Sequence, residues 1–177
     1  ARAAGVETTA IKEAVERFPG VPGRLERVDK GGEFTVFVDY AHTDDALNHV
    51  LGTLRKYALS KLIVVFGCGG QRDQSKRPRM AAVAEKWADV VVVTNDNPRK
   101  EDPKQIIEQI RAGFSAAGLE KMTEIPDRRE AICYALKKAQ PDDVVLIAGK
   151  GHENYQLVGD EKRHFDDREV VKEELRK

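Results

Sequence analysis

Three short runs of almost continuous apolar residues limit most strongly what this chain can fold into. They occupy Leu62–Phe66, residues 90–94 and Val144–Ala148. Strands that are apolar at nearly every position are typical of a parallel sheet with both faces covered. Strand and helix in repeated alternation favour an open sheet with helices on both sides. The sequence therefore predicts an α/β fold with an open, mostly parallel, Rossmann-like sheet.

Segments with apolar residues at helical spacing separate these runs and are predicted to cover the sheet. Val170 and the residue five positions later, Leu175, predict a closing C-terminal helix. The apolar positions of the four internal helices are Ala46, Leu47, Val50, Leu51 and Leu54; Met80, Val83, Ala84 and Trp87; Ile106, Ile107, Ile110 and Phe114; and Ala131, Ile132, Ala135 and Leu136.

The first part of the chain has a different pattern. Residues 9–18 carry apolar side chains at helical spacing, and the sequence Pro19-Gly20-Val21-Pro22-Gly23 then interrupts the chain. Two strands follow at residues 25–29 and 34–39, joined by Lys30-Gly31-Gly32-Glu33, which predicts an N-terminal β-hairpin. We expect a domain boundary near residue 20, with residues 1–20 as the tail of a preceding domain and 21–177 as a domain of its own.

Composition argues against several classes of function. Lysine plus arginine equals aspartate plus glutamate at 30 each, and aromatic residues are 6%, which disfavours nucleic-acid binding. No apolar run is long enough to span a bilayer, and no positively charged start followed by an apolar stretch suggests a secretory signal. Cys68 and Cys133 show no zinc-binding spacing and are expected to be reduced, packed residues of a cytoplasmic protein. The chain begins at Ala1, which fits a processed chain or a fragment.

Four polar clusters follow predicted strands directly, and these are the candidate functional residues. They are residues 39–43, 67–73, 95–99 and 149–153. In open α/β sheets, ligands bind in the crevice beyond the carboxyl ends of the strands. We therefore expect the four clusters to lie along one rim.

The cluster Gly67-Cys-Gly-Gly-Gln-Arg-Asp73 lacks the third glycine of a dinucleotide-binding motif, because Arg72 stands in its place. One interpretation is an ordinary strand-to-helix turn. The other is a site for a carboxylate or phosphate, in which glycines let the backbone approach the ligand. Arginines and a lysine in the following turn, at Arg72, Lys76, Arg77 and Arg79, would then hold the anion.

In the cluster Asn95-Asp-Asn-Pro-Arg99, Pro98 fixes its own φ and restricts Asn97 to extended geometry. A stiff loop that carries an amide and the Arg99 guanidinium suits a carboxylate ligand. The simpler interpretation is a turn that ends the strand before a helix begins at Asp102 and Pro103.

The two remaining clusters have the same two interpretations. Gly149-Lys-Gly-His-Glu153 exposes backbone donors and a lysine, and Glu153 would pair with a ligand ammonium group, unless it is simply solvated. In residues 39–43, Thr43 is a predicted helix N-cap, whereas Asp39 and His42 precede the helix. Asp39 is placed where strand-end acids hold ribose hydroxyls in nucleotide folds.

Taken together, these motifs resemble the C-terminal domain of the UDP-N-acetylmuramoyl-tripeptide synthetases (MurE type) of the Mur ligase family. The resemblance covers nearly everything from Val21 onwards. The matching stretches are Val21-Pro-Gly-Arg24, Val38-Asp-Tyr-Ala-His-Thr43, Phe66-Gly-Cys-Gly-Gly-Gln-Arg-Asp73, Lys76-Arg-Pro78, Asp96-Asn-Pro-Arg99, Gly149-Lys-Gly-His-Glu153 and Asp166-Asp-Arg-Glu169.

The resemblance implies a three-domain cytoplasmic ligase of peptidoglycan synthesis. Such an enzyme uses ATP and Mg²⁺ to activate the carboxylate of a UDP-linked muramoyl dipeptide as an acyl phosphate, which the amine of the incoming amino acid attacks. The Asp-Asn-Pro-Arg motif implies selection of meso-diaminopimelate over lysine. By position, the residues implied for the meso-diaminopimelate site are Arg72, Asp96, Asn97, Pro98, Arg99, Gly149 and Glu153, and those implied to face ATP are Arg24, Asp39, Tyr40 and His42.

The implied catalytic groups and magnesium ligands belong to the central domain, so this domain is expected to contain no catalytic or metal-binding residue and to be inactive alone. The alternative is a nucleotide- or amino-acid-binding α/β module unrelated to ligation, but a dehydrogenase-type module would need the glycine that Arg72 replaces. An interaction domain without a ligand would leave the four strand-end clusters unexplained.

Overall fold

The computed structural model describes residues 4–18, 20–29 and 31–177 and is built on one six-stranded sheet. The strand order is β1-β2-β6-β3-β4-β5, in which β1 is antiparallel to β2 and all other neighbours are parallel. The strands are β1 Glu26–Arg27, β2 Thr35–Asp39, β3 Leu62–Phe66, β4 Val90–Val93, β5 Met122–Glu124 and β6 Val144–Ala148. The predicted mostly parallel sheet is confirmed.

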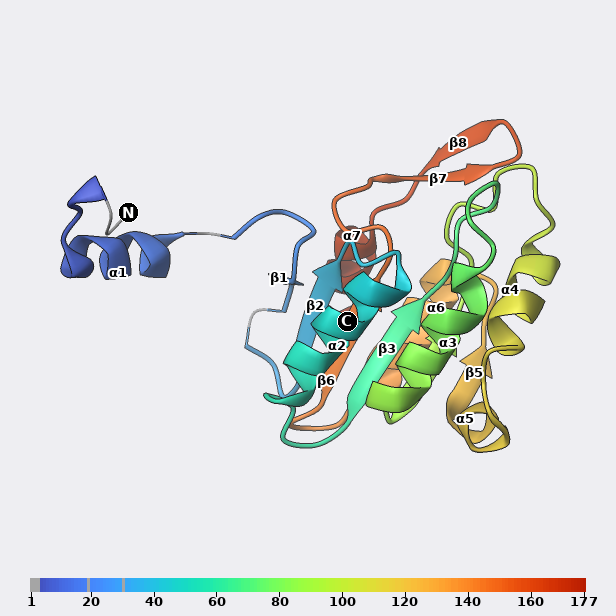
Figure 1. Ribbon diagram of the computed structural model, residues 1–177, viewed down its shortest axis with the longest axis horizontal. Helices are drawn as coiled ribbons and strands as arrows, with labels where there is room; N and C mark the ends of the chain where they lie inside the picture. Colours follow the sequence, from blue (N-terminus) through green and yellow to red (C-terminus); the bar gives the residue numbers. More distant parts are fainter. Residues whose placement is uncertain (1–3, 19, 30) are drawn as a thin grey trace.

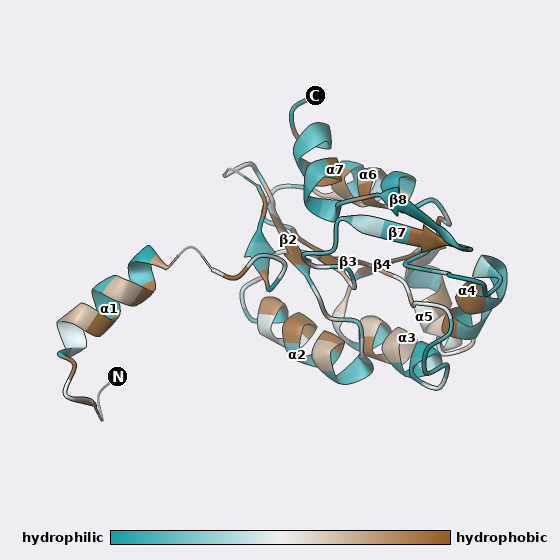
Figure 2. Ribbon diagram, turned by 90° about the horizontal axis from the view of Figure 1, so that it is seen from above, coloured by the Kyte–Doolittle hydropathy of each residue, from teal (hydrophilic) through white to brown (hydrophobic). Residues whose placement is uncertain are grey.

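Helices cover both faces of this sheet, so that the fold has three layers (Figures 1 and 2). One face carries α2 Asp44–Arg55, α3 Lys76–Trp87, α4 Pro103–Arg111 and α5 Ala116–Lys121. The other face carries α6 Arg128–Lys138 and α7 Asp167–Glu174. A separate antiparallel hairpin, β7 Tyr155–Val158 and β8 Glu161–His164, lies at one end of the sheet (Figure 1).

The central strands are apolar throughout because both of their faces are buried. In β3 the side chains of Leu62, Val64 and Phe66 join the core beneath α2, α3 and α4. The alternate residues Ile63 and Val65 join the core beneath α6 and α7. Successive side chains of a strand point to opposite faces, so one short strand supplies two cores.

The predicted helix starts are also confirmed. Thr43 caps α2 by accepting a hydrogen bond from the Ala46 backbone at 3.2 Å, and Asp102 caps α4 in front of Pro103. Aspartate and threonine oxygens satisfy backbone N–H groups that a helix leaves without internal partners. These caps fix where each helix leaves the strand-end rim.

The structure corrects the sequence-based prediction at the C-terminal helix and in several short elements. Leu175 lies beyond α7 and is 42% exposed, whereas Val170 and Val171 are buried. The predicted strand over residues 25–29 is reduced to the two residues of β1, and α5, β5 and the β7–β8 hairpin were not predicted. The N-terminal hairpin itself is confirmed, with Glu26 opposite Val38; Lys30 of its loop lies outside the described residues.

The predicted N-terminal helix is present as α1 Thr8–Arg17, which has no buried residue and extends away from the sheet (Figure 1). Phe18 at its end is 62% exposed. Pro19 of the predicted break lies outside the described residues, and Gly20 has a positive φ of 83°. Within the described part of the chain, no helix is long and apolar enough to cross a membrane.

Candidate functional site

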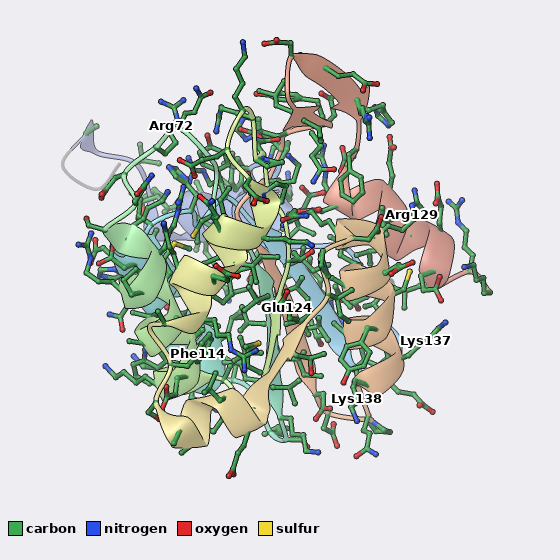
Figure 3. The ribbon with its side chains drawn as sticks, turned by 90° about the vertical axis from the view of Figure 1, so that its right-hand side faces the viewer. Arg72, Phe114, Glu124, Arg129, Lys137 and Lys138 are labelled. Carbon is green, nitrogen blue, oxygen red and sulfur yellow. The ribbon has the colours of Figure 1, made fainter. Side chains whose placement is uncertain are left out.

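The four polar clusters meet in one cavity of about 510 Å³ at the carboxyl ends of β2, β3, β4 and β6. The predicted common rim is therefore present. In Figure 3, Arg72 lies at the same end of the molecule as the β7–β8 hairpin, with Lys137 and Lys138 at the opposite end. The cavity is lined by Tyr40, His42, Thr43, Gly67, Gly69, Arg72, Asp73, Lys76, Asp96, Asn97, Arg99, Gly149, Glu153 and Tyr155.

The glycines after β3 allow two strand-end loops to pack together. The Gly70 N–H donates to the Asn97 carbonyl at 2.9 Å. A Cβ at Gly70 would lie 1.9 Å from the Pro98 carbonyl oxygen, and one at Gly67 would lie 2.2 Å from the Thr94 carbonyl oxygen. Glycine is therefore required at both positions for the two loops to pack, and Gly67 and Gly69 also line the cavity.

Two arginines border the cavity without a carboxylate partner among the described residues. Arg99 is half-buried, and its Nη1 donates to the Gly70 carbonyl at 2.9 Å. Arg72 is exposed at the mouth of the cavity. A guanidinium has five N–H donors in a planar fork that matches a carboxylate. Both residues are therefore free to bind an anionic ligand.

The other predicted cations of the turn after β3 are engaged by the protein itself. Arg77 is buried and pairs with Glu101 and Gln109, and Arg79 pairs with Asp44. Lys76 is buried, and its Nζ donates to the His42 carbonyl at 2.6 Å. Of the cations predicted to surround an anion, Arg72 and Lys76 line the cavity, and Lys76 is already bound to the His42 carbonyl.

A network of hydrogen bonds joins the loop after β4 to the loop after β6. Glu153 Oε2 accepts from Asn97 Nδ2 at 3.0 Å and lies 3.4 Å from Lys150 Nζ. Asn97 Oδ1 accepts from the Leu157 backbone at 2.9 Å and from Lys150 at 3.3 Å. The amide of Asn97 therefore orients Glu153 and the loop, which differs from the predicted role of gripping a carboxylate directly.

Asp96 and Gly149 lie next to each other and both line the cavity. Asp96 is buried, and its Oδ1 accepts from the Asn97 backbone at 2.6 Å. Gly149 has a φ of 117°, and a Cβ at this position would lie 2.8 Å from Asp96 Oδ2. Only glycine adopts this backbone conformation readily and leaves the Asp96 carboxylate its space.

The residues expected to face a nucleotide form an edge that partly overlaps the cavity. Arg24 lies over the Tyr40 ring at 4.7 Å, and the His42 ring lies 4.7 Å from the Tyr40 ring. Tyr40 and His42 line the cavity, whereas Arg24 and Asp39 do not. Burial raises the pKa of Tyr40, with a further contribution from Glu153, so this phenol is neutral at physiological pH.

Asp39 has a structural role that the sequence did not reveal. Its Oδ2 accepts from the Leu25 backbone at 2.6 Å, and its Oδ1 accepts from the Ala41 backbone at 2.7 Å. Each carboxylate oxygen has a second lone pair, so a ribose contact is compatible with these bonds. Among the described residues, no group of three His, Cys, Asp or Glu side chains is arranged to hold a metal ion.

Comparison with known proteins identifies the family. The family described as Mur ligase, glutamate ligase domain matches residues 23–151. The chain belongs to the Mur ligase family. This membership decides against the alternative of a module unrelated to ligation.

Over the segment that they share with this chain, similar Mur ligases are about half identical to it. It is 54% identical over 170 residues to a UDP-N-acetylmuramoyl-L-alanyl-D-glutamate--2,6-diaminopimelate ligase of Geobacillus thermodenitrificans, covering 96% of this chain and 35% of the relative. The ligase of the same name from Syntrophomonas wolfei is 52% identical over 172 residues and is matched over 97% of this chain and 35% of its own length. This chain therefore spans about a third of the length of the curated relatives it matches.

Solved structures agree with this placement. A structure of a UDP-N-acetylmuramoyl-L-alanyl-D-glutamate--2,6-diaminopimelate ligase superposes with a TM-score of 0.83 at 44% identity, covering 99% of this chain and 36% of that chain. A folylpolyglutamate synthase of Thermotoga maritima has a TM-score of 0.59 at 21% identity, covering 84% and 32%, and shares the fold alone.

One residue of this Mur ligase domain's cavity was missed from the sequence. Tyr155 lines the cavity from β7, and Lys162 of β8 lies 4.1 Å from its ring. Its position three residues after His152, beyond the polar cluster that follows β6, gave no sign of a strand. The hairpin that carries it also contacts Arg99 through backbone hydrogen bonds.

Proposed function

We propose that this chain is the amino-acid-binding domain of an ATP-dependent ligase that adds meso-diaminopimelate to UDP-N-acetylmuramoyl-L-alanyl-D-glutamate in peptidoglycan synthesis. The printed names of the relatives support this substrate pair. The proposal divides the chain near residue 20, with residues 1–20 as the tail of a central domain and 21–177 as the amino-acid-binding domain. The exposed α1 helix, which has no buried residue, supports that division.

The observation that carries the proposal is which charged side chains in the 510 Å³ cavity have an oppositely charged partner and which do not. Arg72 and Arg99 have no carboxylate partner among the described residues, while Glu153 and Asp96 lie on the same cavity. Meso-diaminopimelate carries an ammonium and a carboxylate at each end, and lysine lacks the distal carboxylate. A site with an arginine fork rejects an analogue that leaves this fork unpaired, so lysine should bind poorly.

In the proposed mechanism this domain binds and orients the amino acid. Arg99 holds the distal carboxylate bidentately, and Glu153, held in place by Asn97, accepts hydrogen bonds from the distal ammonium. Fixing one end of the substrate directs the reactive amine at the other end out of the cavity towards the acyl donor, which lowers the entropy cost of the reaction. No proton transfer is required of these residues.

ATP supplies the activation of the dipeptide carboxylate when it is bound. In this domain, Arg24 and Tyr40 are the residues that fit such a ligand, because an exposed guanidinium stacked on an aromatic ring presents both charge and a flat surface. His42 extends the same surface beside Tyr40. In the proposed enzyme, the magnesium ligands belong to the central domain, as the resemblance to the Mur ligases implies.

The test is amino-acid-dependent ADP release by the full-length ligase, with UDP-muramoyl dipeptide and either meso-diaminopimelate or lysine. We expect strong preference for meso-diaminopimelate. Equal use of lysine would overturn the proposed specificity. The 177-residue chain alone should release no ADP, and robust turnover by it would overturn the assignment of this chain to the amino-acid-binding part.

A further inference from the structure

The β7–β8 hairpin depends on the loop that carries Arg99. β7 and β8 form a two-stranded sheet of their own, in which the four residues of β8 are all exposed and those of β7 are half-buried. An isolated two-stranded hairpin is only marginally stable in water. The hairpin must therefore be held in place by its other neighbours.

Two backbone hydrogen bonds join this hairpin to Arg99, one through its N–H and one through its carbonyl. The Arg99 N–H donates to the Leu157 carbonyl at 3.0 Å, and the Gly159 N–H donates to the Arg99 carbonyl at 2.7 Å. The two segments thus form a short parallel bridge, Arg99 opposite Val158. Lys100 adds an ion pair of 2.8 Å to Asp160 at the tip of the hairpin.

Arg99 needs such support because its backbone is in the left-handed region, with a φ of 54°. A residue with a Cβ is disfavoured in this conformation and keeps it only where the surroundings impose it. The left-handed turn directs the Arg99 side chain back to the Gly70 carbonyl at the cavity wall. The hairpin therefore helps to place the guanidinium.

Among the described contacts, one hairpin side chain reaches this loop by a hydrogen bond to its backbone. Gln156 Nε2 donates to the Asp96 carbonyl at 2.7 Å. Gln156 and Val158 face a second cavity of about 460 Å³ behind the loop, whereas Tyr155 faces the main cavity. β7 thus contributes side chains to both cavities, and Gln156 lies on the cavity away from the proposed ligand.

We propose that Gln156 is a positioning residue for the selection of meso-diaminopimelate. It fixes the hairpin to the loop at Asp96, and the hairpin in turn holds Arg99 in its left-handed conformation. The identity of the ligand in this inference rests on the proposed function. The support of Arg99 by the hairpin does not. The family match ends at residue 151, so the hairpin lies outside the segment described for the family in general, while the diaminopimelate ligases match almost the whole chain.

The test compares Gln156→Met with Gln140→Met in the 177-residue chain. Methionine keeps the length of the side chain but removes the amide donor. Gln140 is exposed and follows α6 near the start of β6, so it provides the same chemical change at the opposite end of the sheet. Gln156→Glu, which keeps the shape but does not donate when ionised, is the second variant if Gln156→Met does not fold by circular dichroism.

The first readout is amide hydrogen exchange by NMR, which needs no ligand. Loss of one hydrogen bond should speed exchange of the Arg99 and Gly159 amides about threefold to tenfold. The Gln140→Met control should leave both rates unchanged. Unchanged rates at Arg99 and Gly159 in the Gln156 variants would overturn the inference whatever the ligand proves to be.

The second readout is the dissociation constant for meso-diaminopimelate and for L-lysine, from NMR titration. The Gln156 variants should bind meso-diaminopimelate about threefold to tenfold more weakly, with lysine changed less than twofold. General loss of structure would weaken both ligands equally, and that result would overturn the positioning role. If the unmodified chain itself fails to prefer meso-diaminopimelate, the proposed function fails instead, and the exchange data still decide the structural step.

Discussion

Two arginines near the end of β4 show how the same side chain serves two regions of this molecule. Arg128, at the start of α6, is fully buried and forms a two-point ion pair with Asp167 at 2.8 and 2.7 Å. It also donates to the carbonyls of Ala148 at 3.1 Å and Asn95 at 3.4 Å. Arg99, four residues beyond Asn95, has two carbonyl contacts and no carboxylate among the described residues.

The difference indicates which arginine maintains the fold and which is available to a ligand. A buried charge without a partner is strongly unfavourable, so Arg128 and Asp167 depend on each other. Together they tie α6 and α7 to the ends of β4 and β6. The Arg99 guanidinium borders the cavity instead, and its pairing requires an anion from outside the described chain.

The largest effect is expected from breaking the buried pair. Asp167→Ala leaves Arg128 buried without its carboxylate and should lower the free energy of unfolding by about 3–5 kcal/mol. Urea denaturation monitored by circular dichroism measures this change. The matched control is Arg129→Ala, which breaks the exposed Arg129–Glu173 pair between the same two helices and should have a much smaller effect. A similar loss in both variants would mean that burial does not distinguish the two pairs.

Arg99→Ala should instead affect ligand selection and leave stability nearly unchanged. A hydrogen bond to a charged group contributes about 1.5–3 kcal/mol, so kcat/KM for meso-diaminopimelate in the full-length ligase should fall roughly tenfold to a hundredfold. Lysine, which lacks the distal carboxylate, should lose little. Arg99→Lys should restore only part of the activity, since an ammonium group does not replace the planar fork. Equal losses for the two amino acids would show that Arg99 only supports its loop.

The nucleotide edge should respond separately from the amino-acid cavity. Arg24→Ala in the full-length ligase should raise the KM for ATP by about twofold to fivefold, as expected for an exposed charge contact, without changing the KM for meso-diaminopimelate. Asp39→Ala should also weaken ATP use, and it should lower stability because the backbone N–H groups of Leu25 and Ala41 lose their carboxylate acceptor. A loss confined to the KM for the amino acid would reverse the assignment of the two edges.

The smallest effect is expected from thiol modification. Burial raises the pKa of Cys68 to about 12, although this residue lies two positions after β3 and its glycine neighbours line the cavity. Burial also raises the pKa of Cys133, which is only partly buried. At pH 8 the thiolate form of Cys68 is about one part in ten thousand, so iodoacetamide should modify Cys133 first and Cys68 only after unfolding. Rapid labelling of Cys68 in the folded chain would contradict the burial of this part of the rim.

The sheet and the position of the rim were predictable because they depend on local patterns. Continuous apolar runs such as Leu62–Phe66 indicate strands buried on both faces, and parallel strands bring the segments after them to the same edge. Thr43 and Asp102 mark their helices because capping involves neighbouring residues only. The family resemblance of the strand-end motifs was likewise correct.

Pairing between distant side chains was not predictable. Arg77 and Arg99 look equally available in the sequence, but Arg77 meets Glu101 across 24 residues, whereas Arg99 meets no acid among the described residues. The β7–β8 hairpin was missed because β8 consists of exposed polar residues and β7 pairs with the irregular backbone around Arg99. Neither contact leaves a periodic pattern in the sequence.

The most direct test of the account is ¹⁵N-edited NMR of the arginine Nε–H groups in this chain during titration with meso-diaminopimelate. The account predicts that the Arg99 signal shifts on binding and that the Arg128 signal, already held by Asp167, does not move. L-lysine at the same concentrations should leave both signals unchanged. An Arg99 signal that stays fixed with meso-diaminopimelate, or that shifts equally with lysine, would contradict the claim that Arg99 is the arginine kept for the ligand.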